Sequence, residues 1–197
     1  MIEKEAITDF DVHELIKKRW SPRAFSTKPV DLIVIKELLE AARWSASSFN
    51  EQPWRFIVGI KDQNKAYEKI LDALVEFNQL WAKNAPVLIL ACGSRKFEHN
   101  GKDNRHYAYD VGQAVASLAI QATDANLYLH QMAGFDPGKA QEALNIPNDY
   151  DPLTVIALGY KDSPDTLNDK LKEMELKERT RRPLSEICFG DTWNFPL

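Results

Sequence analysis

An uninterrupted apolar run at residues 85–92, Ala-Pro-Val-Leu-Ile-Leu-Ala-Cys, constrains the fold of this chain more than any other segment. Because its length suits a strand and every position is apolar, it predicts a central strand buried on both faces of a sheet. Further strands are expected at about residues 55–60 and at residues 154–158, just before Gly159. The run is far shorter than the roughly 18 apolar residues of a membrane span, so no membrane association is expected.

Most of the remaining chain shows the periodicity of amphipathic helices. Helices are expected at residues 9–19, 29–44, 64–77, 107–126, 137–144 and 167–178. Thr8 or Asp9 would cap the first, and Asp136 followed by Pro137 would begin the fifth. Interleaved Lys and Glu residues in the last one predict a solvated face. Many helices with few strands predict an α+β fold rather than a doubly wound α/β fold.

Length and composition indicate one ordinary globular domain over residues 1–197, because 44% of its residues are hydrophobic and can form a core. The net charge of −4 argues against a nucleic-acid binder with a basic surface. Cys92 and Cys188 form no CxxC pair, so two buried free thiols are expected. The acidic N-terminus lacks the apolar segment of a signal peptide, and we therefore expect a cytoplasmic location.

Two regions indicate contact with another subunit. The helix expected at residues 107–126 is rich in small residues and apolar nearly all round, which indicates deep burial or a subunit interface. The tail at residues 183–197 has little of its own to pack against. We expect it to form an extended arm that lies on a partner subunit.

A polar loop separates the helix expected at residues 29–44 from the strand that follows it. Its side chains that can face a ligand are Ser45, Ser47, Ser48, Asn50 and Gln52. Short polar side chains offer many hydrogen bonds and lose little conformational entropy when they are fixed. The loop therefore suits a flat ligand that is rich in heteroatoms.

Two arginine groups lie at opposite ends of the sequence. Residues 19–25, Arg-Trp-Ser-Pro-Arg-Ala-Phe, place two cations and a hydroxyl in an irregular turn, because Pro22 prevents a helix. Such a set can hold a phosphate and the polar edge of a ring. The second group, at residues 179–182, could simply be a solvated helix end. Beside the other polar clusters, binding is the favoured interpretation.

The motifs of several enzyme classes are missing. No two of the eight glycines have GxG spacing, which argues against a Rossmann dinucleotide site and a P-loop. The four histidines are scattered, so no metal site is expected, and no GxSxG motif marks a serine hydrolase. Asp110 could be catalytic, but a buried carboxylate bonded to the backbone is favoured. Polar and basic clusters without a catalytic dyad are typical of a protein whose chemistry belongs to a cofactor.

Six motifs occur in the order typical of one family. They are residues 19–25, 47–54 (Ser-Ser-Phe-Asn-Glu-Gln-Pro-Trp), 78–81, 132–136 (Met-Ala-Gly-Phe-Asp), 158–160 and 179–184. Over about residues 10–195 the chain resembles the nitroreductase family of FMN-dependent flavoproteins. The resemblance implies a nitroreductase-like fold, with a central, mainly antiparallel sheet flanked by helices. It also implies a homodimer that binds FMN in its interface and exchanges the C-terminal arm.

The resemblance further implies which residues bind the cofactor. Contacts to the phosphate, the ribityl chain and the pyrimidine edge would come from Arg19, Trp20, Ser21, Arg23, Arg179 and Arg181, whereas Arg182 is left unassigned. Asn78 would bond the polar ring edge, and the backbone N–H groups of Ala133 and Gly134 would lie near flavin N5 and O4. The other subunit would contribute Ser47, Ser48 and Asn50.

The implied activity is that of an NAD(P)H-dependent FMN oxidoreductase with ping-pong turnover. NADH or NADPH would reduce the flavin and leave, and a nitroaromatic, quinone or similar small acceptor would follow. No catalytic side chain is expected, since hydride transfer occurs at the flavin. A cation such as Arg23 would stabilise the reduced, anionic flavin and raise its potential. Ala133 and Trp81 differ from the residues found at these positions in some members of the family. The differences bear on the reduction potential of the flavin and on the choice of substrate.

Three alternatives remain open. A dehalogenase-like enzyme of the same fold would need lid insertions, and the segment at residues 94–105 is short. A flavin-binding redox sensor or regulatory dimer would hold the cofactor without efficient turnover. A helical interaction protein would use the small-residue helix only as a dimer face and would bind no flavin.

Overall fold

An antiparallel sheet forms the centre of the computed structural model, which describes residues 2–197. Its strands are β1 (Trp54–Ile60), β2 (Val87–Ser94), β3 (Tyr128–Met132) and β4 (Tyr150–Gly159), in the order β1-β2-β4-β3. β2 is buried except at Ser94 and pairs along both edges, which confirms the predicted central strand. The edge strand β3 is absent from the expectations, because His130 and Gln131 interrupt its apolar pattern.

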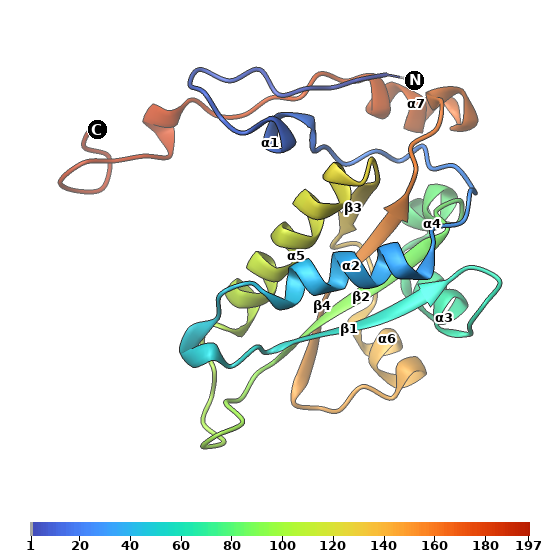
Figure 1. The fold of residues 1–197 in the computed structure, drawn as a ribbon, viewed down its shortest axis with the longest axis horizontal. Helices are drawn as coiled ribbons and strands as arrows, with labels where there is room; N and C mark the ends of the chain where they lie inside the picture. The colour runs from blue at the N-terminus through green and yellow to red at the C-terminus, as the bar shows by residue number, and fades with distance from the viewer. Residues whose placement is uncertain (1) are drawn as a thin grey trace.

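Helices flank this sheet (Figure 1), so the α+β class and the antiparallel sheet are confirmed. The α-helices are α1 (Glu14–Lys18), α2 (Leu32–Arg43), α3 (Ala66–Ala73), α4 (Glu76–Ala82), α5 (Tyr107–Asp124), α6 (Pro137–Leu144) and α7 (Asp169–Leu176). The short 3₁₀ turns are η1 (Ser48–Asn50), η2 (Pro164–Thr166) and η3 (Leu184–Glu186). Asp136 caps α6 as expected, since its side chain accepts from the Lys139 N–H.

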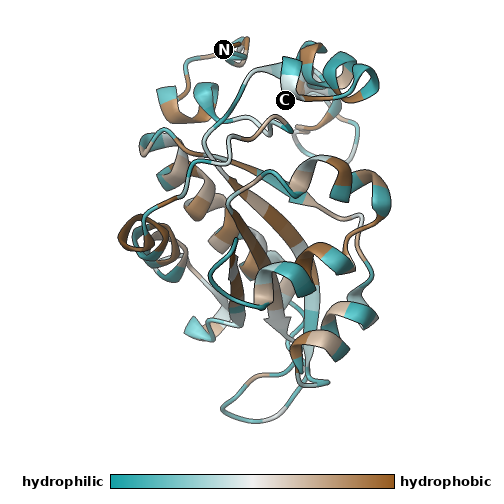
Figure 2. Ribbon diagram, turned by 90° about the vertical axis from the view of Figure 1, so that its right-hand side faces the viewer, coloured by the Kyte–Doolittle hydropathy of each residue, from teal (hydrophilic) through white to brown (hydrophobic). Residues whose placement is uncertain are grey.

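The side chains of β2 alternate between two hydrophobic clusters, one on each face of the sheet. Val87 and Ile89 pack with residues of α2 and α5. Leu88 and Leu90 pack with residues of α3, α4 and α6. Figure 2 shows the hydrophobic strands enclosed between helices whose outer surfaces are more polar. Burial of aliphatic side chains on both faces contributes most of the stability of such a layered fold.

The first helix is shorter than the sequence predicts. α1 begins at Glu14, and the Nδ1 atom of His13 accepts the capping hydrogen bond from the Leu15 N–H, so neither Thr8 nor Asp9 is its cap. The segment before α1 is extended and bonds elsewhere: the Ala6 N–H donates to the Lys17 carbonyl oxygen at 2.9 Å. The chain before α1 therefore folds back against the helix and does not extend it.

The helix predicted at residues 64–77 is in fact two helices. α3 ends at Ala73 and α4 begins at Glu76, because Leu74 has an extended backbone. Leu74 forms an isolated bridge with Phe135, and the Val75 N–H donates to the Gly134 carbonyl oxygen at 3.1 Å. These partners lie about sixty residues away in sequence, so helical periodicity alone could not show the break.

The two ends of the chain lie on the same side of the body, beside α1 and α7 (Figure 1). Residues 183–197 extend from the body, and the Trp193 side chain is 83% exposed. Cys92 is buried as expected, but Cys188 is only half-buried because it lies on this extension. Within residues 2–197, no helix has both the length and the apolar character needed to cross a bilayer.

Candidate functional site

A cluster of cations surrounds a cavity of about 250 Å³ beside α7. The side chains that line it include Lys4, Arg19, Trp20, Ser21, Arg23, Glu175, Arg179 and Arg181. The structure thus brings together the two arginine groups that lie at opposite ends of the sequence. A cavity bordered by several guanidinium groups and a hydroxyl is suited to an anion such as a phosphate.

Three arginines of this cavity, Arg19, Arg23 and Arg179, are half-buried, whereas Arg181 is exposed. Burial lowers the pKa of Arg19, and the charges of Arg179 and Arg181 lower it further. Burial also lowers the pKa of Arg23, against the opposing attraction of Glu175. The positive charges of these arginines repel one another and are partly shielded from water, and both effects are unfavourable. A bound anion would offset them.

Lys4 also belongs to the cluster, although no sequence pattern indicates it. Its Nζ donates to the carbonyl oxygen of Glu175 at 2.7 Å and also to that of Lys177. It lies 5.2 Å from the ring centre of Trp20. The lysine therefore neutralises the negative end of α7, which would otherwise face the anion. Only the tertiary pairing of the N-terminal segment with α7 reveals this role.

Glu175 and His130 hold the turn that carries Ser21 and Arg23. One carboxylate oxygen of Glu175 accepts hydrogen bonds from the N–H groups of Arg23 (3.0 Å) and Ala24 (3.2 Å). The expectation of a fully solvated face on the last helix is therefore wrong at Glu175, which is 1% exposed. Charge interleaving in sequence does not show that one carboxylate faces inward.

His130 contacts the same turn from β3. Its Nδ1 lies 2.9 Å from the Pro22 carbonyl oxygen, which can only accept, so Nδ1 carries the proton. Burial lowers the pKa of His130 to about 4, helped by the charges of Arg23 and Arg19 and opposed by the hydrogen bond to Pro22. The imidazole is therefore neutral near pH 7.

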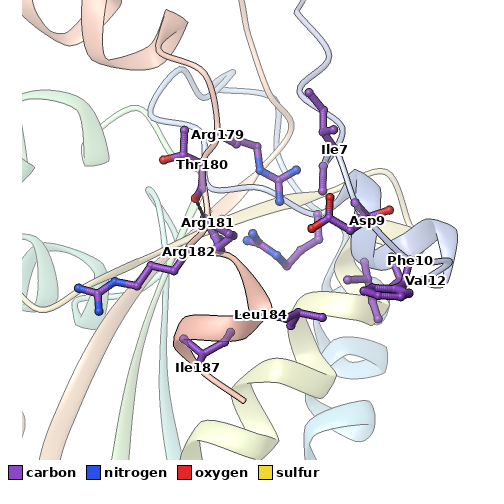
Figure 3. Close-up of a pocket in the computed structure, with 14 residues that line it drawn as sticks. Ile7, Asp9, Phe10, Val12, Arg179, Thr180, Arg181, Arg182, Leu184 and Ile187 are labelled. Carbon is purple, nitrogen blue, oxygen red and sulfur yellow. Dashed lines mark hydrogen bonds between the residues drawn. The ribbon is translucent and has the colours of Figure 1, made fainter. Parts of the chain in front are cut away.

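A larger cavity of about 650 Å³ shares Arg19, Arg179 and Arg181 with the first one (Figure 3). Its other wall is mainly apolar and is formed by the N-terminal segment and the start of the C-terminal extension; it includes Ile7, Phe10, Val12, Ile16, Leu184 and Ile187. Arg179 points toward the N-terminal segment, whereas Arg182 extends away from it (Figure 3). Arg182 nevertheless lines this cavity together with Arg179 and Arg181.

A second candidate region follows β3. The Asn78 Nδ2 donates to the Gly134 carbonyl oxygen at 3.0 Å, so this amide, expected at a ring edge, also supports the backbone. A Cβ at Gly134 would lie 2.7 Å from that same nitrogen, and only glycine fits without displacement. Within residues 2–197 the Gly134 N–H donates no hydrogen bond. It is therefore free to bond a ligand, and the assignment of Ala133 and Gly134 to a flavin stays a prediction.

The polar loop has an unusual backbone. Phe49, Asn50 and Gln52 all have positive φ angles, of 54°, 57° and 51°, a conformation that costs energy in residues other than glycine. The Ser48 N–H donates to the Asp110 carboxylate at 3.0 Å. Since Asp110 is buried and bonded to the backbone, the structural interpretation of this residue is confirmed.

The structure does not bring the polar loop to the cation cavity within one chain. The loop, with η1, lies at the end of the body opposite α7 and the chain termini (Figure 1). Some of its hydroxyls are used locally: Ser47 Oγ accepts from the Gln52 N–H at 3.0 Å, and Ser45 Oγ lies 2.7 Å from Ser117 Oγ. Ser47, Ser48 and Asn50 thus occupy a separate surface of the subunit.

The model of the Nitroreductase family matches residues 16–79 and 60–160. The chain belongs to the nitroreductase family. A solved structure described as an oxidoreductase containing FMN has a TM-score of 0.90 and 32% sequence identity, and the match covers 95% of each chain. These comparisons confirm the expected family and fold.

Two relatives give the range of names within the family. A Streptococcus pyogenes protein named as an NAD(P)H nitroreductase is 24% identical, over 84% of this chain and 98% of its own length. Iodotyrosine deiodinase 1 of Rattus norvegicus is 26% identical, over 81% of this chain and 65% of its own length. Nitroreductase-family sequences of this similarity thus carry both reductase and dehalogenase names.

Proposed function

We propose that this nitroreductase-family protein is an FMN-dependent oxidoreductase that takes electrons from NAD(P)H. The cation cavity carries the proposal, because Arg19, Arg23, Arg179 and Arg181 meet around a space that suits the phosphate end of FMN. The FMN-containing structural neighbour and the family confirm the expected cofactor class. The relative named as an NAD(P)H nitroreductase supports a nicotinamide as electron donor.

The donors of the candidate site fit a flavin. FMN presents phosphate, hydroxyl and ring carbonyl oxygens, and the residues near both regions are mainly hydrogen-bond donors. The Trp20 Nε1 beside the cavity is buried and has no hydrogen-bond partner within residues 2–197. The absent Cβ of Gly134 and its free N–H allow a ring to approach the backbone closely. The positive charge, the hydrogen-bond donors and the space of the candidate site therefore all suit FMN.

Each group of residues has a separate task in this proposal. Bound FMN supplies the hydride chemistry at its ring. Arg19, Arg179 and Arg181 hold the phosphate, and Ser21 and Arg23 orient the ribityl chain and the pyrimidine edge. A fixed cation at that edge stabilises the negative charge that accompanies reduction. No acidic or basic side chain is assigned to proton transfer, and water supplies the protons.

We infer a homodimer in which the polar loop of one subunit completes the site of the other. Within one chain this loop lies far from α7, which borders the cation cavity, and that separation supports the arrangement (Figure 1). Two exposed surfaces are available for the contact: the C-terminal arm, residues 183–197, and the small-residue stripe of α5 at Ala108, Gly112 and Ala116. The cytoplasmic location stays a prediction.

The visible spectrum of the purified protein, followed by anaerobic titration with NADH and with NADPH, tests the function. We expect a yellow protein whose absorbance is bleached by at least one donor and restored by a nitroaromatic or a quinone, as ping-pong turnover requires. A yellow protein that stays oxidised with both nicotinamides would contradict the proposed oxidoreductase and favour a flavin-binding sensor.

A dehalogenase of the same fold is the second candidate, favoured by the match to the rat deiodinase. The segment at residues 95–106, between β2 and α5, contains no helix and offers little chain for a lid. This observation favours the reductase. Halide release from an iodophenol by the reduced protein, measured beside nitroaromatic reduction, distinguishes the two.

A further inference from the structure

Glu175 is an enclosed carboxylate within a cluster of cations. It projects from the last turn of α7, is 1% exposed, and contributes to the lining of the cavity with Arg19 and Arg23. We propose that Glu175 is a positioning residue that fixes the turn at residues 21–24, so that Arg23 meets the cofactor in one orientation. The inference rests on the proposed function, because the cofactor is the FMN assigned above.

The geometry of the carboxylate is matched to the turn. Pro22 has no N–H group, and the next two N–H groups, those of Arg23 and Ala24, converge on Glu175. The second oxygen of Glu175 also accepts from the Arg23 N–H, at 2.9 Å. Consecutive backbone N–H groups that converge form a concave anion site. Here the carboxylate of the same chain fills that site from the inside.

The other side of the turn is fixed as well. The Nδ1–H of His130, on β3, donates to the Pro22 carbonyl oxygen at 2.9 Å. The backbone at Pro22, Arg23 and Ala24 is therefore bonded on two sides by groups that belong to two different elements, α7 and β3. Because the backbone determines where the side chain leaves it, these bonds set the direction of Arg23.

Because Glu175 carries a negative charge, the direction of the change in FMN affinity on its replacement tests the inference. A carboxylate beside an anion site repels the anion, so a role through charge alone predicts that its removal tightens FMN binding. A positioning role predicts the opposite, because hydrogen bonds from buried N–H groups to a charged acceptor are lost. The two roles therefore lead to opposite changes in the same dissociation constant.

The first experiment compares Glu175→Gln with Glu178→Gln. Both remove one negative charge from the cavity lining, but Glu178 is exposed and makes no hydrogen bond to the turn. For Glu175→Gln we expect FMN binding to weaken about tenfold, the size expected for a lost charged hydrogen bond.

The control variant Glu178→Gln should bind FMN as tightly as the wild type or slightly more tightly. Glu175→Asp, which keeps the charge but shortens the side chain, should also weaken binding.

Amide exchange of the FMN-free protein supplies a second readout that does not depend on the cofactor. We expect the N–H groups of Arg23 and Ala24 to exchange faster in Glu175→Gln, while those of Leu88 and Leu90 in β2 stay protected. That pattern separates local release of the turn from general unfolding. The exchange measurement also separates this inference from the proposed function. A wild-type protein that cannot bind FMN would contradict the proposed function, whereas amide exchange would still test the role of Glu175.

Two results would overturn the positioning role. One is FMN binding by Glu175→Gln that equals or exceeds the binding by the wild type. The other is unchanged exchange at Arg23 and Ala24 in the same variant, whether or not FMN binds.

Discussion

Arg179 is hydrogen-bonded to the backbone of Lys4, with its Nη1 2.6 Å from the carbonyl oxygen. The same nitrogen donates to the Lys17 carbonyl oxygen at 2.9 Å, so one side chain joins the N-terminal segment and α1 to the end of α7. A guanidinium has five N–H donors, and the remaining ones can bond a ligand. The N-terminal segment is therefore part of the frame of the anion site, although it lies outside every motif of the family.

Replacement of Lys4 by Ala should weaken FMN binding several-fold. The Lys4 ammonium contributes positive charge to the cavity and bonds the carbonyl oxygens at the end of α7. Its loss exposes the negative end of that helix to the phosphate. Fluorescence titration of FMN at low and moderate salt measures the effect, which salt should reduce. Lys36→Ala, at an exposed position of α2, is the matched control.

Replacement of Gly134 by Ala should weaken FMN binding without unfolding the protein. The new methyl group would lie 2.7 Å from the Asn78 Nδ2, so the hydrogen bond to the Gly134 carbonyl oxygen would be displaced. Gly138→Ala is the control, because a Cβ there makes only an ordinary contact at 3.4 Å with Asp136. Equal FMN affinity in the two variants would argue against a flavin near Gly134.

Folding stability should fall as the pH is lowered from about 6.5 to about 4. The pKa of His130 is about 4 in the folded protein, against 6.5 for the ordinary imidazole. Between these values the unfolded chain binds more protons, so the contribution of His130 is complete above pH 6.5 and is lost as the pH falls through that range. The expected loss is about 1–3 kcal/mol.

Urea unfolding at pH 7 and at pH 4.5 measures this dependence. His130→Gln removes the titrating group and should reduce the difference between the two pH values. His106→Gln, at an exposed histidine that pairs with no carboxylate within residues 2–197, should leave it unchanged. A pH dependence that is the same in all three proteins would show that other groups cause it.

Local patterns predicted the parts of the fold that depend on neighbouring residues. The apolar run of β2 and the Asp136-Pro137 start of α6 are examples, because burial on two faces and helix capping both leave a local signature. The break between α3 and α4 left none. It arises from the contact of Leu74 and Val75 with residues 134–135, which only the tertiary structure supplies.

The residues of the candidate site also divide into those with a local sequence signature and those that depend on tertiary contacts. Arg19, Arg23, Arg179 and Arg181 were predictable because arginine-rich turns and the family motifs are visible in sequence. Lys4 and Glu175 were not, because a lysine near the N-terminus and one glutamate in a charged helix resemble ordinary surface residues. Their function in the site depends on burial and on the partners that the fold brings to them.

Replacement of Asn50 by Gly should weaken FMN binding if the side-chain amide contacts the flavin. Asn50 has a φ of 57°, and glycine adopts this conformation without strain, so the loop keeps its shape while the amide is lost. Asn145→Gly is matched to it, since Asn145 has a φ of 53° at the end of α6. Equal FMN affinity in the two variants would exclude the Asn50 amide from the site.

Dilution should release FMN, because the polar loop and α7, which borders the cation cavity, lie at opposite ends of one subunit (Figure 1). If Ser47, Ser48 and Asn50 complete the partner's site, the monomer retains the phosphate contacts but loses one wall around the ring. FMN fluorescence, which is quenched in many protein sites, should therefore rise over the same concentration range in which light scattering or sedimentation detects monomers.

In the same dilution experiment, Asn50→Gly should release FMN at a higher protein concentration, whereas Asn145→Gly should follow the wild type. Monomers that retain FMN at full affinity would show that one subunit forms the whole site, and the polar loop would then need another function.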